Sequence, residues 1–158
     1  MPLSTIDSTG ITSPVGPLVL TGVTDGSNAL AGTVGEFVYS AVVASASGLT
    51  SGTPTNVTSI SLTAGDWDVQ GAISFNQNTG TSATYAIGSV TTTSATNPGL
   101  TYETFIAVTE LTASAFSCPV PSLRVNVTTT TTVYLVGQCN FSGGTIGAGG
   151  FIRARRVR

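Results

Sequence analysis

Asp66 and Asp68 are the acidic residues whose spacing could do chemistry, because they flank Trp67 and project from the same side of a strand. Two carboxylates on one side could bind calcium or act as the acid pair of a glycoside hydrolase. A simpler interpretation places Asp66 in a turn, where it accepts local backbone N–H groups, and Asp68 on an outward strand face beside an arginine. We favour the simpler interpretation and expect neither a metal site nor a catalytic site.

The chain contains no histidine and no lysine among its 158 residues. Histidine titrates nearest neutral pH, and histidine or lysine handles protons in most general acid–base and nucleophilic sites. The glycine-rich stretch 143–150 lacks the Gly-Lys-Ser/Thr ending of a phosphate-binding loop and is expected to be a turn followed by a strand. We therefore predict a protein that is not an enzyme and uses no cofactor.

Four of the five arginines lie in the last six positions. In a strand, Arg153 and Arg155 project from one face while Arg156 and Arg158 project from the other, so their charges cannot form one patch. Phosphate binding is an alternative use for arginine, but the net charge of -2 and the lack of other basic surface argue against a nucleic-acid partner. We expect ion pairs within or between subunits, with partners among Glu36, Asp66, Asp68, Glu103 and Glu110.

Cys118 and Cys139 could pair, but a chain made in a reducing cytoplasm is expected to keep buried free thiols. Residues 1–10 lack the basic and apolar regions of a secretory signal, and no apolar run approaches the ~20 residues that span a bilayer. We expect synthesis in a cytoplasm and no membrane partner.

The composition indicates a surface made mostly of hydroxyl groups. Charged residues are 8% of the chain, whereas 28 threonines and 18 serines supply 46 of the 158 positions. An average soluble protein carries about 25% charged residues. Such a surface suits a protein covered by its own copies or docked on a larger particle, where exposed charges would have to be desolvated.

Two parts of the chain differ in character. Residues 1–32 are rich in Gly, Pro, Ser and Thr without a sustained period, which predicts an extended arm. The apolar stretch Pro17, Leu18, Val19 and Leu20 within the arm could anchor it in a groove of a partner. Residues 33–158 are expected to form one domain with a single core.

Short strands separated by turns predict an all-β domain. The segment 67–75 alternates with Trp67, Val69, Ile73 and Phe75 on one face, which is the period of a half-buried strand. The turn 64–66 before it predicts a hairpin with the preceding strand. Eight strands indicate an antiparallel jelly-roll β-sandwich. The expected strands are 34–44, 57–63, 67–75, 82–92, 102–111, 120–128, 132–141 and 146–157.

The strand 132–141 carries apolar residues on both faces. Val133 and Leu135 alternate with Tyr134 and Val136, and the second pair is expected to point outward. Because an outward apolar face needs a cover, a subunit interface is predicted there.

Three segments resemble a group of small tailed-bacteriophage virion proteins that occur as head fibres, capsid decoration proteins or tail-fibre tips. The segments are Asn56-Val-Thr-Ser-Ile-Ser-Leu-Thr-Ala-Gly-Asp-Trp-Asp-Val69, Thr131-Thr-Val-Tyr-Leu-Val136 and Gly150-Phe-Ile-Arg-Ala-Arg-Arg-Val157. The resemblance covers approximately residues 33–158 and points to the virion rather than to one part of it. It implies a trimeric jelly roll of the tumour-necrosis-factor type, docked to the particle by its N-terminal arm.

The resemblance implies a homotrimeric head fibre or decoration protein located in the virion, whose arm binds the major capsid protein or another virion protein. The expected subunit contacts are Tyr134, Val136, Phe151, Arg153 and Arg155. The alternative is a tail-fibre tip that recognises a host-surface glycan or protein through loops such as 76–82 or 93–100. The absence of a long repetitive shaft favours the first interpretation.

Overall fold

The computed structural model describes residues 5–7, 10–12, 24–108 and 115–158. Throughout these ranges the regular structure is β-strand, and no helix there is long and apolar enough to cross a membrane. The prediction of an all-β protein is confirmed.

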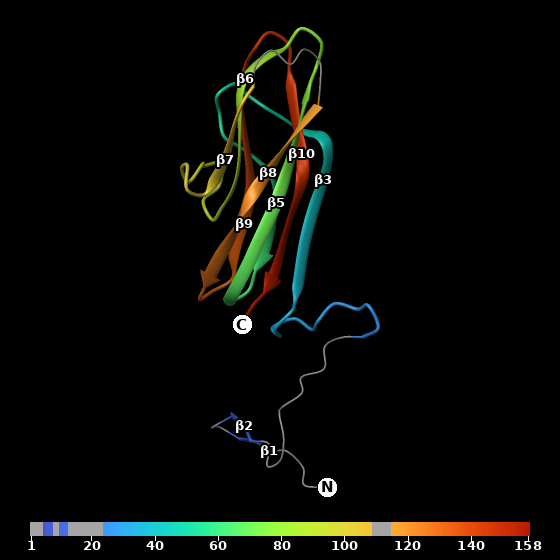
Figure 1. Ribbon diagram of the computed structural model, residues 1–158, viewed down its shortest axis with the longest axis vertical. Helices are drawn as coiled ribbons and strands as arrows, with labels where there is room; N and C mark the ends of the chain where they lie inside the picture. The colour runs from blue at the N-terminus through green and yellow to red at the C-terminus, as the bar shows by residue number, and fades with distance from the viewer. Residues whose placement is uncertain (1–4, 8–9, 13–23, 109–114) are drawn as a thin grey trace.

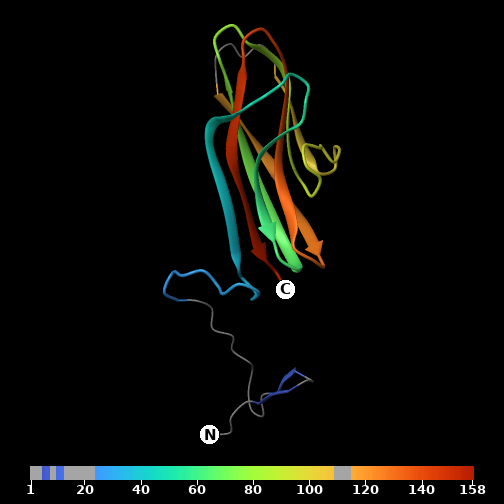
Figure 2. The same cartoon turned by 180° about the vertical axis from the view of Figure 1, so that it is seen from behind.

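Eight strands form two antiparallel four-stranded sheets that pack face to face (Figure 1). The first sheet has the order β3 (Phe37–Gly48), β10 (Ile146–Arg156), β5 (Gly65–Gln77), β8 (Ala115–Val127). The second sheet has the order β4 (Thr55–Leu62), β9 (Thr131–Ser142), β6 (Ser82–Thr91), β7 (Glu103–Ala107). Figure 2 shows the sandwich from behind.

The strand order is that of a jelly roll. The chain crosses from one sheet to the other between β3 and β4, β4 and β5, β5 and β6, β7 and β8, β8 and β9, and β9 and β10. Among the eight strands of the sandwich, β6 and β7 are the one consecutive pair that lies side by side in the same sheet. Two interleaved four-stranded sheets with these crossings are the jelly-roll arrangement, so the predicted fold class is confirmed.

All eight predicted strands are present, but the predicted hairpin between 57–63 and 67–75 is wrong. β4 pairs with β9, whereas β5 pairs with β10 and β8. The turn after Leu62 carries the chain to the opposite sheet instead of reversing it within one sheet. β8 also begins earlier than predicted, at Ala115, because Pro119 and Pro121 lie on an edge strand, where a missing N–H donor is tolerated.

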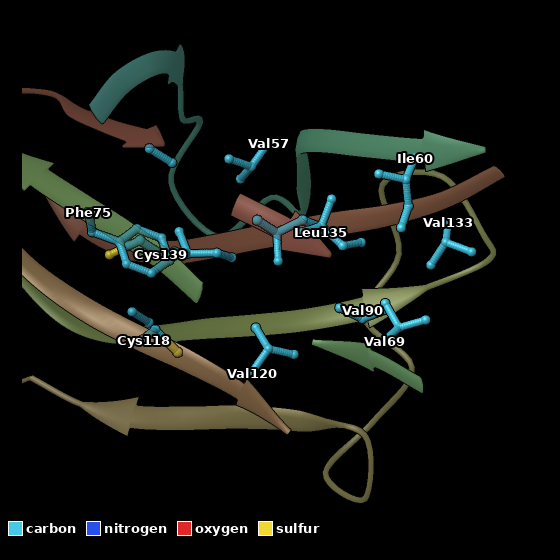
Figure 3. Close-up of a cluster of buried hydrophobic side chains, with 14 of the residues drawn as sticks. Val57, Ile60, Val69, Phe75, Val90, Cys118, Val120, Val133, Leu135 and Cys139 are labelled. Carbon is cyan, nitrogen blue, oxygen red and sulfur yellow. The ribbon is translucent and has the colours of Figure 1, made fainter. Parts of the chain in front are cut away.

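The core lies between the sheets and consists of the inward residues of both (Figure 3). Trp67, Val69, Ile73 and Phe75 are fully buried, as the alternation predicts. Each such side chain contributes about 1.5–3 kcal/mol by leaving water. The sheets approach closely at Gly71, where an added Cβ would lie 2.8 Å from the Leu135 side chain.

The N-terminal residues contain one short pairing, β1 (Thr5–Asp7) with β2 (Gly10–Thr12). Composition alone did not predict it. The proposed anchor at residues 17–20 lies outside the described residues. From residue 30 the chain turns into β3 through backbone bonds, including Gly35 N–H to Arg156 O at 2.9 Å.

Candidate functional site

The predicted subunit contacts lie on opposite sheets of the sandwich. Tyr134 and Val136 belong to β9 in the second sheet, whereas Phe151, Arg153 and Arg155 belong to β10 in the first. Both groups lie on outward faces, since their strand neighbours Leu135, Ile152 and Ala154 are buried in the core. One continuous patch cannot contain all five residues.

Val136 is fully buried within a single subunit. Its partners across the sheet are Asn56 and Ser89, and the loop 94–97 forms hydrogen bonds with both. The Asn56 amide donates to Ser94 Oγ at 2.7 Å, and the Ser89 hydroxyl donates to Asn97 Oδ1 at 3.0 Å. The outer face at Val136 is therefore covered by the protein's own loop, and Val136 offers no surface to a neighbour.

Gln138 continues this cover. Its amide oxygen accepts a hydrogen bond from the Asn97 amide, and its amide nitrogen donates to Gly52 O at 2.9 Å and to Tyr85 Oη at 3.2 Å. The Ala95 N–H donates to Asn56 Oδ1 at 2.7 Å. We call residues 94–97 with these partners the loop cover. It joins β4, β6 and β9 through neutral groups alone.

The first sheet carries an aromatic strip on its outer face, which we define as Phe37, Tyr39 and Phe151. Tyr39 stacks between the other two, with ring centroids 6.3 Å from each. The Arg153 guanidinium lies 5.8 Å from the centre of the Phe151 ring and donates to Gln70 Oε1 at 2.8 Å. Tyr39 remains 57% exposed, so the strip is an uncovered apolar surface.

Strand alternation and register build this strip. Phe37 and Tyr39 are two residues apart on β3, so they share a face, and Arg153 lies opposite Tyr39 on β10. Phe151 lies two residues before Arg153. The sequence signal was present in the spacing of Phe37 and Tyr39, but their meeting with Phe151 depends on a pairing between distant parts of the chain.

Arg156 is buried at the end of the sandwich where the chain enters β3. Its guanidinium forms an ion pair with Glu36 at 2.9 Å, donates to Ala64 O at 2.7 Å, and lies 4.3 Å from the Trp67 ring centre. Burial opposes ionisation of Glu36, but hydrogen bonds from Gly32 N–H and Arg156 lower its pKa overall. The pairing joins the segment before β3 to the last strand, and the predicted arginine–glutamate partnership is confirmed for this pair.

Asp66 is held by two arginines. Arg124 donates to its two carboxylate oxygens at 2.7 Å each, and Arg158 donates at 2.8 Å. The hydrogen bond from Arg124 is the largest cause that holds the pKa of Asp66 below its usual value. The carboxylate is thus occupied by guanidinium groups rather than by the local backbone N–H groups first expected. Asp68 is exposed on the outer face of the same strand.

The described residues contain no cluster of three or more histidine, cysteine or acidic side chains arranged for a metal ion. Cys118 and Cys139 are both buried free thiols, as predicted. Burial raises the pKa of each thiol to about 11. Both side chains point into the core in Figure 3 and serve as packing groups.

An open hollow of about 820 Å³ adjoins the aromatic strip. One wall is the segment 27–35, and the other is formed by Phe37, Arg153 and Arg155. A smaller hollow of about 360 Å³ lies directly over the aromatic strip and Arg153. Both hollows lie on the first sheet and the chain segment that leads into it.

The second sheet has one exposed aromatic group of its own, near β7. Tyr85 stacks on Phe105 with ring centroids 5.3 Å apart, and Phe105 and Tyr102 are each 50% exposed. Tyr102 follows the loop 93–100, for which the sequence suggested a host-ligand role. The side chains of Ser94 and Asn97 in that loop are turned toward the protein by the loop cover.

Neither a protein-family model nor a curated protein matches the chain. Among solved structures, it is similar to the VP2 subviral particle of infectious bursal disease virus, with 15% identity and a TM-score of 0.46 over 94% of this chain and 39% of that one. The Gt strain of the same virus gives 16% identity and a TM-score of 0.46 over 98% and 40%. The chain thus spans 39 to 40% of the length of these structures. At this level of similarity, neither family nor function carries over.

The protein is an all-β jelly roll in which the loop 94–97 covers the second sheet around Val136, while the first sheet carries an uncovered aromatic strip. Among the described residues, the features that could serve a function are the aromatic strip and the ion pairs of Glu36 and Asp66.

Proposed function

We propose that this protein is a non-enzymatic structural component of a virion, a homotrimeric head fibre or capsid decoration protein anchored by its N-terminal arm. The observation that carries the proposal is the uncovered aromatic strip on an otherwise hydroxyl-rich jelly roll. Exposed stacked aromatics beside arginine are typical of the centre of a protein interface. The resemblance of residues 33–158 to small phage virion proteins supports the same function.

A threefold ring accounts for contact residues on two different sheets. In a ring, each contact is heterologous, so one surface of a subunit meets a different surface of the next. We assign the aromatic strip to one side of the contact, and Tyr134 of the neighbouring subunit to the other. Arg153 and Arg155 line the hollow beside the strip and are left outside this contact. Val136 is left out because the loop cover already buries it.

Solution mass tests this assignment. The chain of 15.8 kDa is expected to elute at three times that mass by size-exclusion chromatography with light scattering. Tyr39→Asp and Tyr134→Asp should each give the monomer, because each places a charge in one half of the contact. Tyr102→Asp is the matched control and should remain trimeric. A monomeric wild type excludes the trimer, and trimeric Tyr39→Asp or Tyr134→Asp excludes the assigned contact.

Electron cryomicroscopy of the source virion tests the location. Threefold knobs spread over the shell would support a head fibre or decoration protein bound through residues 1–32. Knobs confined to the tail would contradict it.

A tail-fibre tip that binds a host-surface glycan is the second candidate, and the exposed Tyr102 and Phe105, the latter stacked on the half-buried Tyr85, favour it. Aromatic rings with an open face are suitable platforms for sugars. Glycan-array binding that disappears in Phe105→Ala would support this candidate, while binding unaffected by that change would remove its structural basis.

A further inference from the structure

β3 begins at the same end of the sandwich at which β10 ends (Figure 1). The hollow of about 820 Å³ is lined by residues of this end. Its lining includes two strongly exposed aliphatic side chains, Leu30 at 79% and Val34 at 69%. Arg153 and Arg155 stand on the opposite wall. The hollow therefore combines an aliphatic wall with two guanidinium groups.

Arginine is concentrated around this hollow. All five arginines lie at this end of the first sheet, together with the carboxylates of Glu36, Asp66 and Asp68. Asp25 approaches the rim, where its carboxylate accepts the Ser27 N–H at 3.0 Å. With Asp25 and the carboxylate of the last residue included, the charges at this end balance, so the distribution of ion pairs decides which arginines can bind a partner.

The arginines at this end differ in what they already bind. Arg124, Arg156 and Arg158 are in ion pairs with Asp66 or Glu36. Arg153 donates to the neutral Gln70 and is in none of the ion pairs of the described residues. Asp68 lines a neighbouring small hollow together with Arg153 and Arg155. Within the described residues, Arg155 has no ion pair and no side-chain hydrogen bond, although Asp68 lies across from it in the sheet. Free guanidinium donors match the geometry of a carboxylate.

We propose that this hollow binds an acidic peptide segment with aliphatic side chains, contributed by the virion protein to which the arm docks. The proposal rests on the proposed function, because it assumes a partner reached through the arm. Leu30 and Val34 favour a peptide over a glycan, since a saturated wall suits aliphatic side chains, and the one aromatic ring in the lining, Phe37, already stacks on Tyr39. The carboxylates of the segment meet Arg153 and Arg155, and its aliphatic groups meet the opposite wall.

The position of the hollow explains how it contributes to docking. Residues 24–32 are the last part of the arm and residues 33–36 lead from it into β3, so any partner held by the arm is close to the hollow. Two weak sites joined by a short linker bind a common partner with an avidity that exceeds either affinity by roughly 10²–10⁴. The hollow then fixes the orientation of the jelly roll on the particle, which an extended arm alone does not.

Fluorescence anisotropy with a labelled hexapeptide of alternating leucine and glutamate tests the proposal on the full chain. Binding is expected to weaken steeply with added salt, because the contacts are partly exposed ion pairs. Arg155→Glu and Leu30→Ser should each weaken binding roughly tenfold or more, a loss of about 1.4 kcal/mol. Thr79→Glu, which adds a carboxylate at the far end of the sandwich, is the control and should bind like the wild type.

Three comparison probes decide the class of ligand. A peptide with lysine for glutamate and one with serine for leucine should both bind at least tenfold more weakly. Equal binding of either peptide, preference for polygalacturonate, no binding, or no effect of Arg155→Glu and Leu30→Ser would each overturn the proposal. The solution mass of the wild type and of each variant separates the peptide-binding proposal from the trimer proposal. If the protein is a trimer but does not bind the peptide, only the peptide-binding proposal is wrong. If it is a monomer that binds the peptide, only the trimer proposal is wrong.

Discussion

Two parts of the outer surface of the sandwich differ in kind: the centre of β9 under the loop cover, and the aromatic strip on the first sheet. On the second sheet, the loop cover buries Val136 completely and satisfies the surrounding amides and hydroxyls. On the first sheet, the aromatic strip stays open, with Tyr39 57% exposed and Arg155 free of ion pairs among the described residues. Both faces come from strands with apolar residues at outward positions, so the strand pattern does not distinguish them.

The difference shows that an apolar outward residue has two possible causes. Val136 is apolar because a loop of the same chain covers it, whereas Phe37 and Tyr39 remain uncovered in the isolated subunit. The first is a requirement of the fold, and the second leaves a surface available to a partner. Substitutions on the two faces should therefore affect different measurements.

The largest expected difference is in the free energy of unfolding. Val136→Asp places an unpaired charge in a fully buried position and should destabilise the chain by about 4 kcal/mol or more. Tyr39→Asp, on the exposed strip, should change it by no more than about 0.5 kcal/mol. Urea denaturation at concentrations where the chain is monomeric measures both values. Similar losses in the two variants would mean that the faces are not different in kind.

A smaller effect is expected from opening the loop cover. Asn97→Ala removes the partner of the buried Ser89 hydroxyl and of the Gln138 amide, which should cost about 1–3 kcal/mol. The rate of amide hydrogen exchange in β9 should also rise in this variant. Asn78→Ala removes one exposed hydrogen bond to Thr145 and is the matched control, expected to cost less. If both variants lose the same stability, the loop does not act as a cover.

The smallest expected effect is on the pH dependence of the unfolding free energy. The ion pairs of the first sheet contain groups that titrate, whereas the loop cover is made of neutral groups. The folded pKa of Asp66 lies below its unfolded value of about 3.9, so its contribution to stability is present above that pH and is lost as the pH falls through the folded pKa. Asp66→Asn should flatten the fall in unfolding free energy between pH 5 and 2, leaving the contribution of Glu36. An unchanged slope in Asp66→Asn would assign the acid sensitivity to other groups.

The alternation of apolar and polar residues along the sequence was sufficient to predict the fold class. The alternation from Trp67 to Phe75 and the regular spacing of turns located all eight strands, because inward residues of a sandwich must alternate. The pairing of strands was predicted less well. The turn between Leu62 and Trp67 has the same local composition whether the next strand joins the same sheet or the opposite one.

The surfaces depended most on long-range contacts. Tyr134 and Phe151 both appear at outward positions, but only the register shows that they belong to opposite sheets. The burial of Val136 requires Asn97 to reach Gln138 across the sheet, and no local pattern encodes that contact. The ion pairs were easier to predict, because the chain offers only five arginines and seven acidic residues.

The contact between Arg156 and the segment before β3 has a mechanical consequence. Gly35 N–H donates to Arg156 O at 2.9 Å, and Arg156 N–H donates to Glu36 O at 2.9 Å, beside the buried side-chain ion pair. Tension applied through residues 24–34 meets these bonds before it reaches the ladder of β3 with β10. These hydrogen bonds therefore carry the load first. The β3–β10 pairing and the core behind it should stay intact when the particle pulls on the arm.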